Sequence, residues 1–143
     1  MFRSAGALIL LLLLAAFVPF VISSPAEAKR ADHTPPSFAG LKSATCIPGP
    51  IGGGRTASYN LSWDPATDNV TPSKKIVYDV YQANTSGGED FSTPTYTTSA
   101  GATSFATPPL PTDKYFYFVV RAKDQAGNID SNTVEREGQN LCV

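Results

Sequence analysis

Histidine is almost absent from this chain of 143 residues, because His33 is the only one. A Ser-His-Asp or Cys-His arrangement needs an imidazole that a third group holds in place. His33 lies in a polar stretch that ends in two prolines, which indicates a solvated linker residue. The sequence therefore gives no support to a hydrolase that uses a histidine base.

An excess of one charge is also missing. The chain has 11 Lys and Arg against 12 Asp and Glu, a formal net charge of −1. Proteins that bind nucleic acids or anionic membranes normally carry a basic excess. We therefore expect no nucleic-acid partner, and an unknown protein or polysaccharide remains possible as a partner.

Long apolar runs are absent after residue 22, and the one run present lies at the start. Arg3 precedes apolar residues 5–22, which are followed by an Ala-x-Ala step at residues 26–28. This order is typical of a secretory signal peptide, and the run is at the lower limit of length for a membrane span. We predict a cleaved signal peptide at residues 1–28 and a secreted or extracellular protein with no stable membrane span.

Helical periodicity is missing from Ser37 onwards, and the 12 prolines and 11 glycines of the chain interrupt every longer segment. Residues 56–63 instead alternate apolar and polar side chains, as half-buried strands do, and residues 76–82 place Ile76, Tyr78 and Val80 on one face. Seven short strands separated by turns predict an all-β fold, a two-sheet antiparallel sandwich. A closed barrel is the alternative. The other five expected strands are at 38–44, 95–99, 103–107, 115–122 and 131–137.

Several motifs follow one another in the order and spacing of a known family. They are DHTPPSFAGL at 32–41, LSWDPATDN at 61–69, YDVYQ at 78–82, Leu110, and FYFVVRAKDQAGNIDS at 116–131. Together they resemble the fibronectin type III domains of exported bacterial proteins. The resemblance implies a seven-stranded immunoglobulin-like sandwich over residues 37–143, after an extended segment at 29–36.

The resemblance also assigns side chains to the core. It places Trp63 in the core of the second strand, and it turns one side of the sixth strand inward. Where the family usually has a tyrosine that bonds back to the backbone, this chain has Phe116, so that hydrogen bond is expected to be missing. The inward set of the sixth strand is Phe116, Phe118, Val120 and Ala122.

Cysteine occurs only twice, at Cys46 and Cys142. In an exported chain an isolated pair favours a disulfide over two free thiols. In the implied sandwich, the first turn and the exit of the last strand lie at the same end. We therefore predict a Cys46–Cys142 disulfide that closes a ring of nearly the whole domain.

The outward sides of the third and sixth strands, which are neighbours in this fold, form the candidate interaction face. Aromatic residues and arginine beside aliphatic ones are typical of protein interfaces, although Val and Tyr are also simply good strand formers. We predict a secreted, non-catalytic, single-domain protein that serves as a protein-binding, adhesion or structural module. A carbohydrate-binding accessory module is the alternative. The face consists of Val77, Asp79, Tyr81, Tyr115, Tyr117, Val119 and Arg121.

Acidic and amide side chains are expected to gather at one end of the sandwich. Calcium takes six to eight oxygen ligands, but no loop here has fixed acidic spacing, and Asp and Asn are common in turns. We therefore expect no metal and no cofactor. The weak calcium candidates are Asp32, Asp68, Asn69, Asp124 and Asn128.

Enzymatic activity is not expected. Asp64, Asp68 and Asp124 are carboxylates of the kind used in hydrolysis, but short loops on a sandwich offer little concavity for a substrate. A small hydrolase is thus the least favoured alternative. Three Asn-x-Ser/Thr patterns, which start at residues 60, 69 and 84, are read as chance matches because the motif is short.

Overall fold

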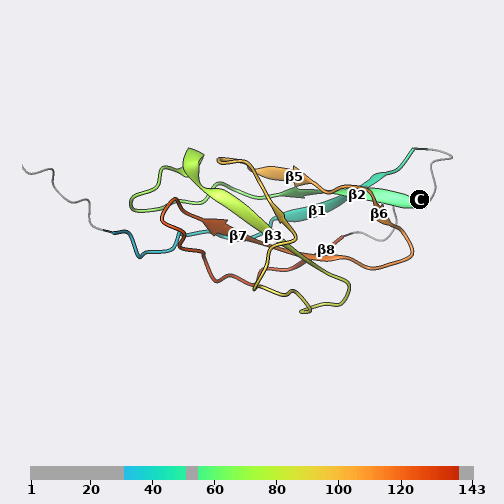
Figure 1. Cartoon of the computed structure of the whole chain (residues 1–143). Coiled ribbons are helices and arrows are strands. Elements are labelled where there is room, and N and C mark those ends of the chain that lie inside the picture. Colours follow the sequence, from blue (N-terminus) through green and yellow to red (C-terminus); the bar gives the residue numbers. More distant parts are fainter. Residues whose placement is uncertain (1–30, 51–54, 139–143) are drawn as a thin grey trace, which may run out of the picture.

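The computed structural model describes residues 31–50 and 55–138 (Figure 1). These residues form two antiparallel sheets, consistent with a β-sandwich, and contain no α-helix. Their one helical turn is the 3-10 segment η1 (Ser73–Lys75). The strands are β1 (Ser43–Pro48), β2 (Thr56–Ser62), β3 (Val77–Ala83), β4 (Tyr96–Thr97), β5 (Ser104–Ala106), β6 (Leu110–Pro111), β7 (Tyr117–Lys123) and β8 (Arg136–Glu137).

One sheet has the order β1-β2-β5, with β6 also paired to β2, and the other has the order β4-β3-β7-β8. The longest pairing of the second sheet joins β3 to β7, from Val77 opposite Lys123 to Ala83 opposite Tyr117. Because side chains alternate across a strand, this register puts every second residue of both strands toward the first sheet.

The core lies between the two sheets and is rich in aromatic rings. Tyr59 on β2 lies 5.5 Å from Phe118 on β7, and Trp63 lies 5.2 Å from Tyr78 on β3, between ring centroids. Full burial of one such side chain stabilises the fold by roughly 1.5–3 kcal/mol. The predicted inward set is confirmed, since Phe116, Phe118, Val120 and Ala122 are all buried in this core.

The first strand begins later than predicted, at Ser43 rather than near Phe38. Gly40 has a φ of +85°, a conformation that interrupts an extended strand. A Cβ on Gly40 would lie 2.6 Å from Val134 Cβ, so this turn also packs tightly against the chain before β8. The glycine therefore separates the N-terminal segment from β1.

Two other predicted strands are much shorter than expected. Thr95 and Thr98 flank β4, and their hydroxyls accept hydrogen bonds from the β3 backbone, so only two residues between them pair as a strand. Before β8, Asp130 Oδ1 accepts a hydrogen bond from Asn132 N, at 2.9 Å. In the same way, Asn132 Oδ1 accepts a hydrogen bond from Val134 N, at 3.0 Å. Such side-chain bonds compete with a strand ladder.

Several predictions fall outside the described residues. The signal peptide at residues 1–28 and Cys142 both lie there, so both stay predictions. Residues 31–36 contain neither helix nor strand. Within the part of the chain that the structure describes, no helix is long and apolar enough to cross a membrane.

Candidate metal centre and binding surfaces

Three segments distant in sequence meet at one end of the sandwich: residues 31–37, the β2–β3 connection and the β7–β8 connection (Figure 1). Ser37 and Thr67 exchange two backbone hydrogen bonds, of 2.8 and 3.0 Å. Gln125 N donates to the hydroxyl of the buried Thr71, at 3.2 Å. The backbone of this end is therefore fixed by contacts between the segments.

The meeting of these segments brings three carboxylates together. One oxygen each from Asp32, Asp68 and Asp124 lie within 4.8 Å of one another. Such proximity of three negative charges is unfavourable unless a cation or hydrogen-bond donors compensate it. The local backbone compensates only part of this charge.

The compensation is incomplete at two oxygens. Asp68 Oδ2 accepts from Val70 N and Thr71 N, at 2.8 and 2.7 Å, and Asp32 Oδ1 accepts from Thr34 N at 3.1 Å. The other oxygens, Asp32 Oδ2 and Asp68 Oδ1, are shielded from solvent and have no hydrogen-bond partner. An unpaired buried acceptor is costly, and a hard cation is the group that would satisfy both.

Asp124 is the deepest of the three, at 5 % exposed. Burial alone would raise the pKa of its carboxyl, but hydrogen bonds from Asn128, Gly127 and Ala126 outweigh burial and lower that pKa. Asn128 donates to both oxygens, from its backbone N and its Nδ2, each at 2.7 Å. Asp124 is therefore ionised at neutral pH.

The other candidates of this region do not all join the cluster. Asn128 does, because its Nδ2 also donates to the backbone oxygen of Asp32, at 3.2 Å. Asn69 is exposed on the same loop as Asp68. Asp64 is exposed and pairs with Lys42 at 3.2 Å, so the three carboxylates considered for hydrolysis include only two members of the cluster.

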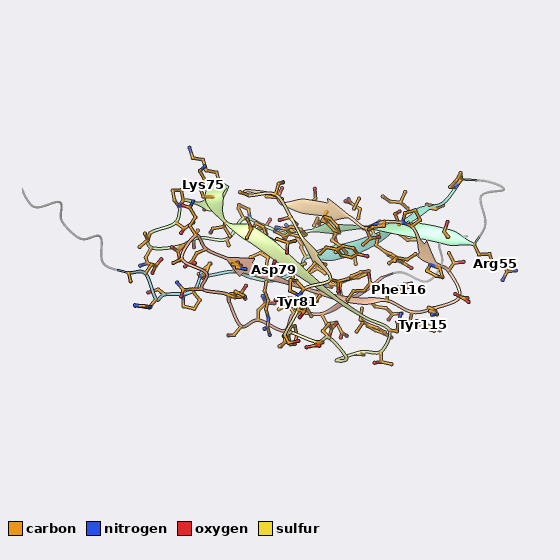
Figure 2. The ribbon with its side chains drawn as sticks, in the orientation of Figure 1. Arg55, Lys75, Asp79, Tyr81, Tyr115 and Phe116 are labelled. Carbon is orange, nitrogen blue, oxygen red and sulfur yellow. The ribbon has the colours of Figure 1, made fainter. Side chains whose placement is uncertain are left out.

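The predicted interaction face is largely covered, and the prediction of an exposed face is wrong for Asp79, Tyr81 and Val119. These three are 1–2 % exposed. Residues 84–95, between β3 and β4, form a cover over Tyr81, with the Phe91 ring centroid 5.1 Å from that of Tyr81. Figure 2 shows Asp79 and Tyr81 within the body of the molecule.

Polar contacts hold this cover in place. The Arg121 guanidinium lies 3.6 Å from the Phe91 ring centroid, and its Nε donates to the backbone oxygen of Asn132, at 3.0 Å. Under the cover, Asp79 Oδ1 accepts from the Thr97 hydroxyl at 2.6 Å. Burial, followed by the nearby Asp79 carboxylate, raises the pKa of Tyr81, so the phenol stays neutral.

Glu89 and Glu135 interact with the part of the cover around Ser86 and Gly87. Glu135 accepts from the Ser86 hydroxyl at 2.7 Å and from Gly87 N at 2.6 Å. Burial and the neighbouring Glu135 raise the pKa of Glu89. For Glu135, burial acts in the same direction, but hydrogen bonds from Gly87, Ser86 and Glu89 outweigh burial and lower its pKa. Glu89 therefore takes up a proton at a higher pH than Glu135 does.

Of the predicted face, Tyr115 is the residue that is clearly exposed, at 56 %, while Val77, Tyr117 and Arg121 are half-buried. Within residues 84–95, Phe91 is the one large apolar side chain in a polar, turn-rich stretch, so little in the sequence indicates the cover.

Comparison of the chain with protein-family models, curated proteins and solved structures gives no match.

Proposed function

We propose that this chain is an exported, non-catalytic module of the fibronectin type III kind that serves in protein binding, adhesion or structural support and binds calcium. The sheet arrangement supports the family, because the resemblance implies that the third and sixth strands are neighbours. Their counterparts β3 and β7 pair along seven residues.

One observation carries the calcium part: Asp32, Asp68 and Asp124 converge from three segments, and two of their oxygens are shielded and unpartnered. Calcium accepts carboxylate oxygens in flexible geometry and completes its shell with water. A flexible shell suits this site, because three side-chain oxygens are at most half of the six to eight that calcium takes, and water can supply the others.

Calcium would tie the N-terminal segment to the body of the domain. Asp32 precedes the first paired residue, Ser37, and the other two carboxylates come from loops of the sandwich. A bound ion would therefore set the direction in which the chain enters the fold. Such stiffening suits a module that positions other parts of an extracellular assembly.

The proposal includes export and a Cys46–Cys142 disulfide. Cys46 lies half-buried on β1 and packs against the core. An exported protein with this disulfide should show no thiol that reacts with an alkylating reagent before reduction. Two alkylated cysteines in the unreduced, native protein would contradict the pairing.

The calcium site is tested by calorimetric titration of the metal-free protein with CaCl₂ and by thermal melting with and without EDTA. Ligand at about 100 times its Kd should stabilise the fold by about 2.7 kcal/mol. Asp68→Asn should remove both the heat and the shift in Tm. Asp64→Asn is the matched control, since Asp64 precedes Asp68 by four residues in the sequence but pairs with Lys42. No heat and no shift at 10 mM calcium, about ten times the weakest extracellular sites, would refute the site.

A further inference from the structure

The connection between β6 and β7 carries an exposed tyrosine beside a hollow, away from the proposed calcium ligands. Tyr115 is the most exposed of the large hydrophobic side chains in residues 31–50 and 55–138. A hollow of about 280 Å³ lies beside it, and Figure 2 shows Tyr115 at the periphery of the molecule. The described lining residues are Thr112, Asp113, Lys114 and Tyr115.

The backbone that carries this hollow is held at both ends. Thr112 N donates to the Arg55 oxygen at 3.0 Å, and Asn84 Nδ2 donates to the Tyr115 oxygen at 2.9 Å. The next residue, Phe116, is buried in the core. A binding surface that is fixed before the ligand arrives loses less conformational entropy on binding.

The side chains around the hollow combine one planar apolar surface with several polar groups. The Tyr115 ring offers an apolar face and a hydroxyl. Thr112 donates and accepts, Asp113 accepts, and Lys114 donates hydrogen bonds. A sugar ring has the matching surface, because one face consists of C–H groups and its edge consists of hydroxyls.

We infer that this hollow binds a sugar ring of a polysaccharide, with the C–H face stacked on Tyr115 and the hydroxyls bonded to Asp113, Lys114 and Thr112. The few polar groups fix the orientation of the ring, as in other small-molecule sites. This inference goes beyond the proposed calcium binding and does not depend on it.

A second tyrosine extends the surface along the chain. Tyr117, at the start of β7, is half-buried. Tyr115 lies just before β7, separated from Tyr117 by one residue. Partial desolvation raises the pKa of Tyr117, and the charges of Glu137, Glu135 and Tyr115 raise it further. Two rings at this spacing suit consecutive sugars of a chain.

Charge restricts the class of polysaccharide. Asp113 lines the hollow, and the negative charges of Glu135 and Glu137 raise the pKa of Tyr117. Lys114 is the one cation among the described lining residues. Carboxylates or sulfates on a ligand would be repelled here. The site therefore fits a neutral polysaccharide.

The test is native affinity electrophoresis of the purified protein in gels that contain hydroxyethyl cellulose, xylan, glycol chitin or, as the acidic comparison, alginate. We expect at least one neutral polymer to slow the protein and alginate to leave it unchanged. Tyr115→Ala should weaken binding by about tenfold or more, the loss expected for a central aromatic contact. Tyr115→Phe should keep most of the affinity.

Two controls make the result specific. Ile47→Ala removes another exposed apolar side chain, on β1, and should bind as the unchanged protein does. Asp68→Asn should also bind normally, so failure of the calcium site and failure of the sugar site are separable. The inference is overturned if no neutral polymer retards the protein, or if Tyr115→Ala and Ile47→Ala migrate alike in every gel.

Discussion

The inner face of the β4-β3-β7-β8 sheet is buried along β3 and β7, whereas its outer face is buried only in part, at residues such as Tyr81 and Val119. The inner face carries apolar side chains such as Tyr78 and Phe118 against the other sheet. On the outer face, residues 84–95 lie against Tyr81 and Arg121, and Arg121 stacks on Phe91. Apolar burial is non-directional, whereas the cover depends on a few directed contacts. The cover should therefore open without unfolding the domain.

The largest effect is expected on the inner face. Phe118→Ala should reduce the free energy of unfolding by roughly 3–5 kcal/mol, because the cavity cannot be filled by the surrounding rings. Urea denaturation measures this loss. Tyr117→Ala, the adjacent residue on the other face, is the matched control and should cost much less. Equal losses at the two positions would remove the difference between the faces.

A smaller and local effect is expected from the cover. Phe91→Ala removes both the cation–π contact with Arg121 and the ring contact with Tyr81, at a cost of about 1–2 kcal/mol. Amide hydrogen exchange should accelerate in residues 84–95 and not in β2. Phe91→Leu keeps apolar volume without the ring and should have an intermediate effect. Faster exchange throughout both sheets would show that the cover is not a separate unit.

The smallest effect concerns pH and the Glu89–Glu135 pair. Because the pKa of Glu135 is lowered in the fold, its ionised form stabilises the cover at any pH above its ordinary pKa of 4.5. This stability is lost as the pH falls through the folded-state pKa. The raised pKa of Glu89 works in reverse, and its contribution is lost as the pH rises through the folded-state value. Protection of Gly87 from exchange should therefore be greatest at an acidic pH between the two pKa values.

Two substitutions distinguish the acidic and alkaline sides of this pH dependence of exchange protection. Glu89→Gln cannot ionise, so the decline of protection on the alkaline side should disappear. Glu135→Gln removes the charged acceptor of Ser86 and Gly87 and should lower protection of the loop at every pH, by about 1 kcal/mol. An unchanged profile in Glu89→Gln would show that protonation of Glu89 has no role in the cover.

Much of the core was predictable because it depends on local alternation. The period of two in residues 56–63 identified Tyr59, Leu61 and Trp63 as buried, and the structure confirms it. The ends of strands were less predictable. Gly40 ends the N-terminal segment through a close approach to Val134, a contact between residues far apart in sequence.

The candidate sites were only partly predictable. The sequence makes Asp32, Asp68, Asn69, Asp124 and Asn128 weak calcium candidates, but nothing in it distinguishes them from ordinary turn residues. The structure distinguishes Asp32, Asp68 and Asp124 by their proximity and by the two unpartnered oxygens. The exposed face was mispredicted because alternation separates the two sides of a strand and not the buried from the exposed side.

The sequence by itself determined which side chains of each long strand lie together, because the geometry of a strand imposes that alternation on any chain. Only the tertiary structure decided what covers the second side and which carboxylates meet. Those outcomes depend on the path of residues 84–95 and on contacts such as that between Asp32 and Asn128. Such contacts join residues far apart in the sequence, so no local pattern encodes them.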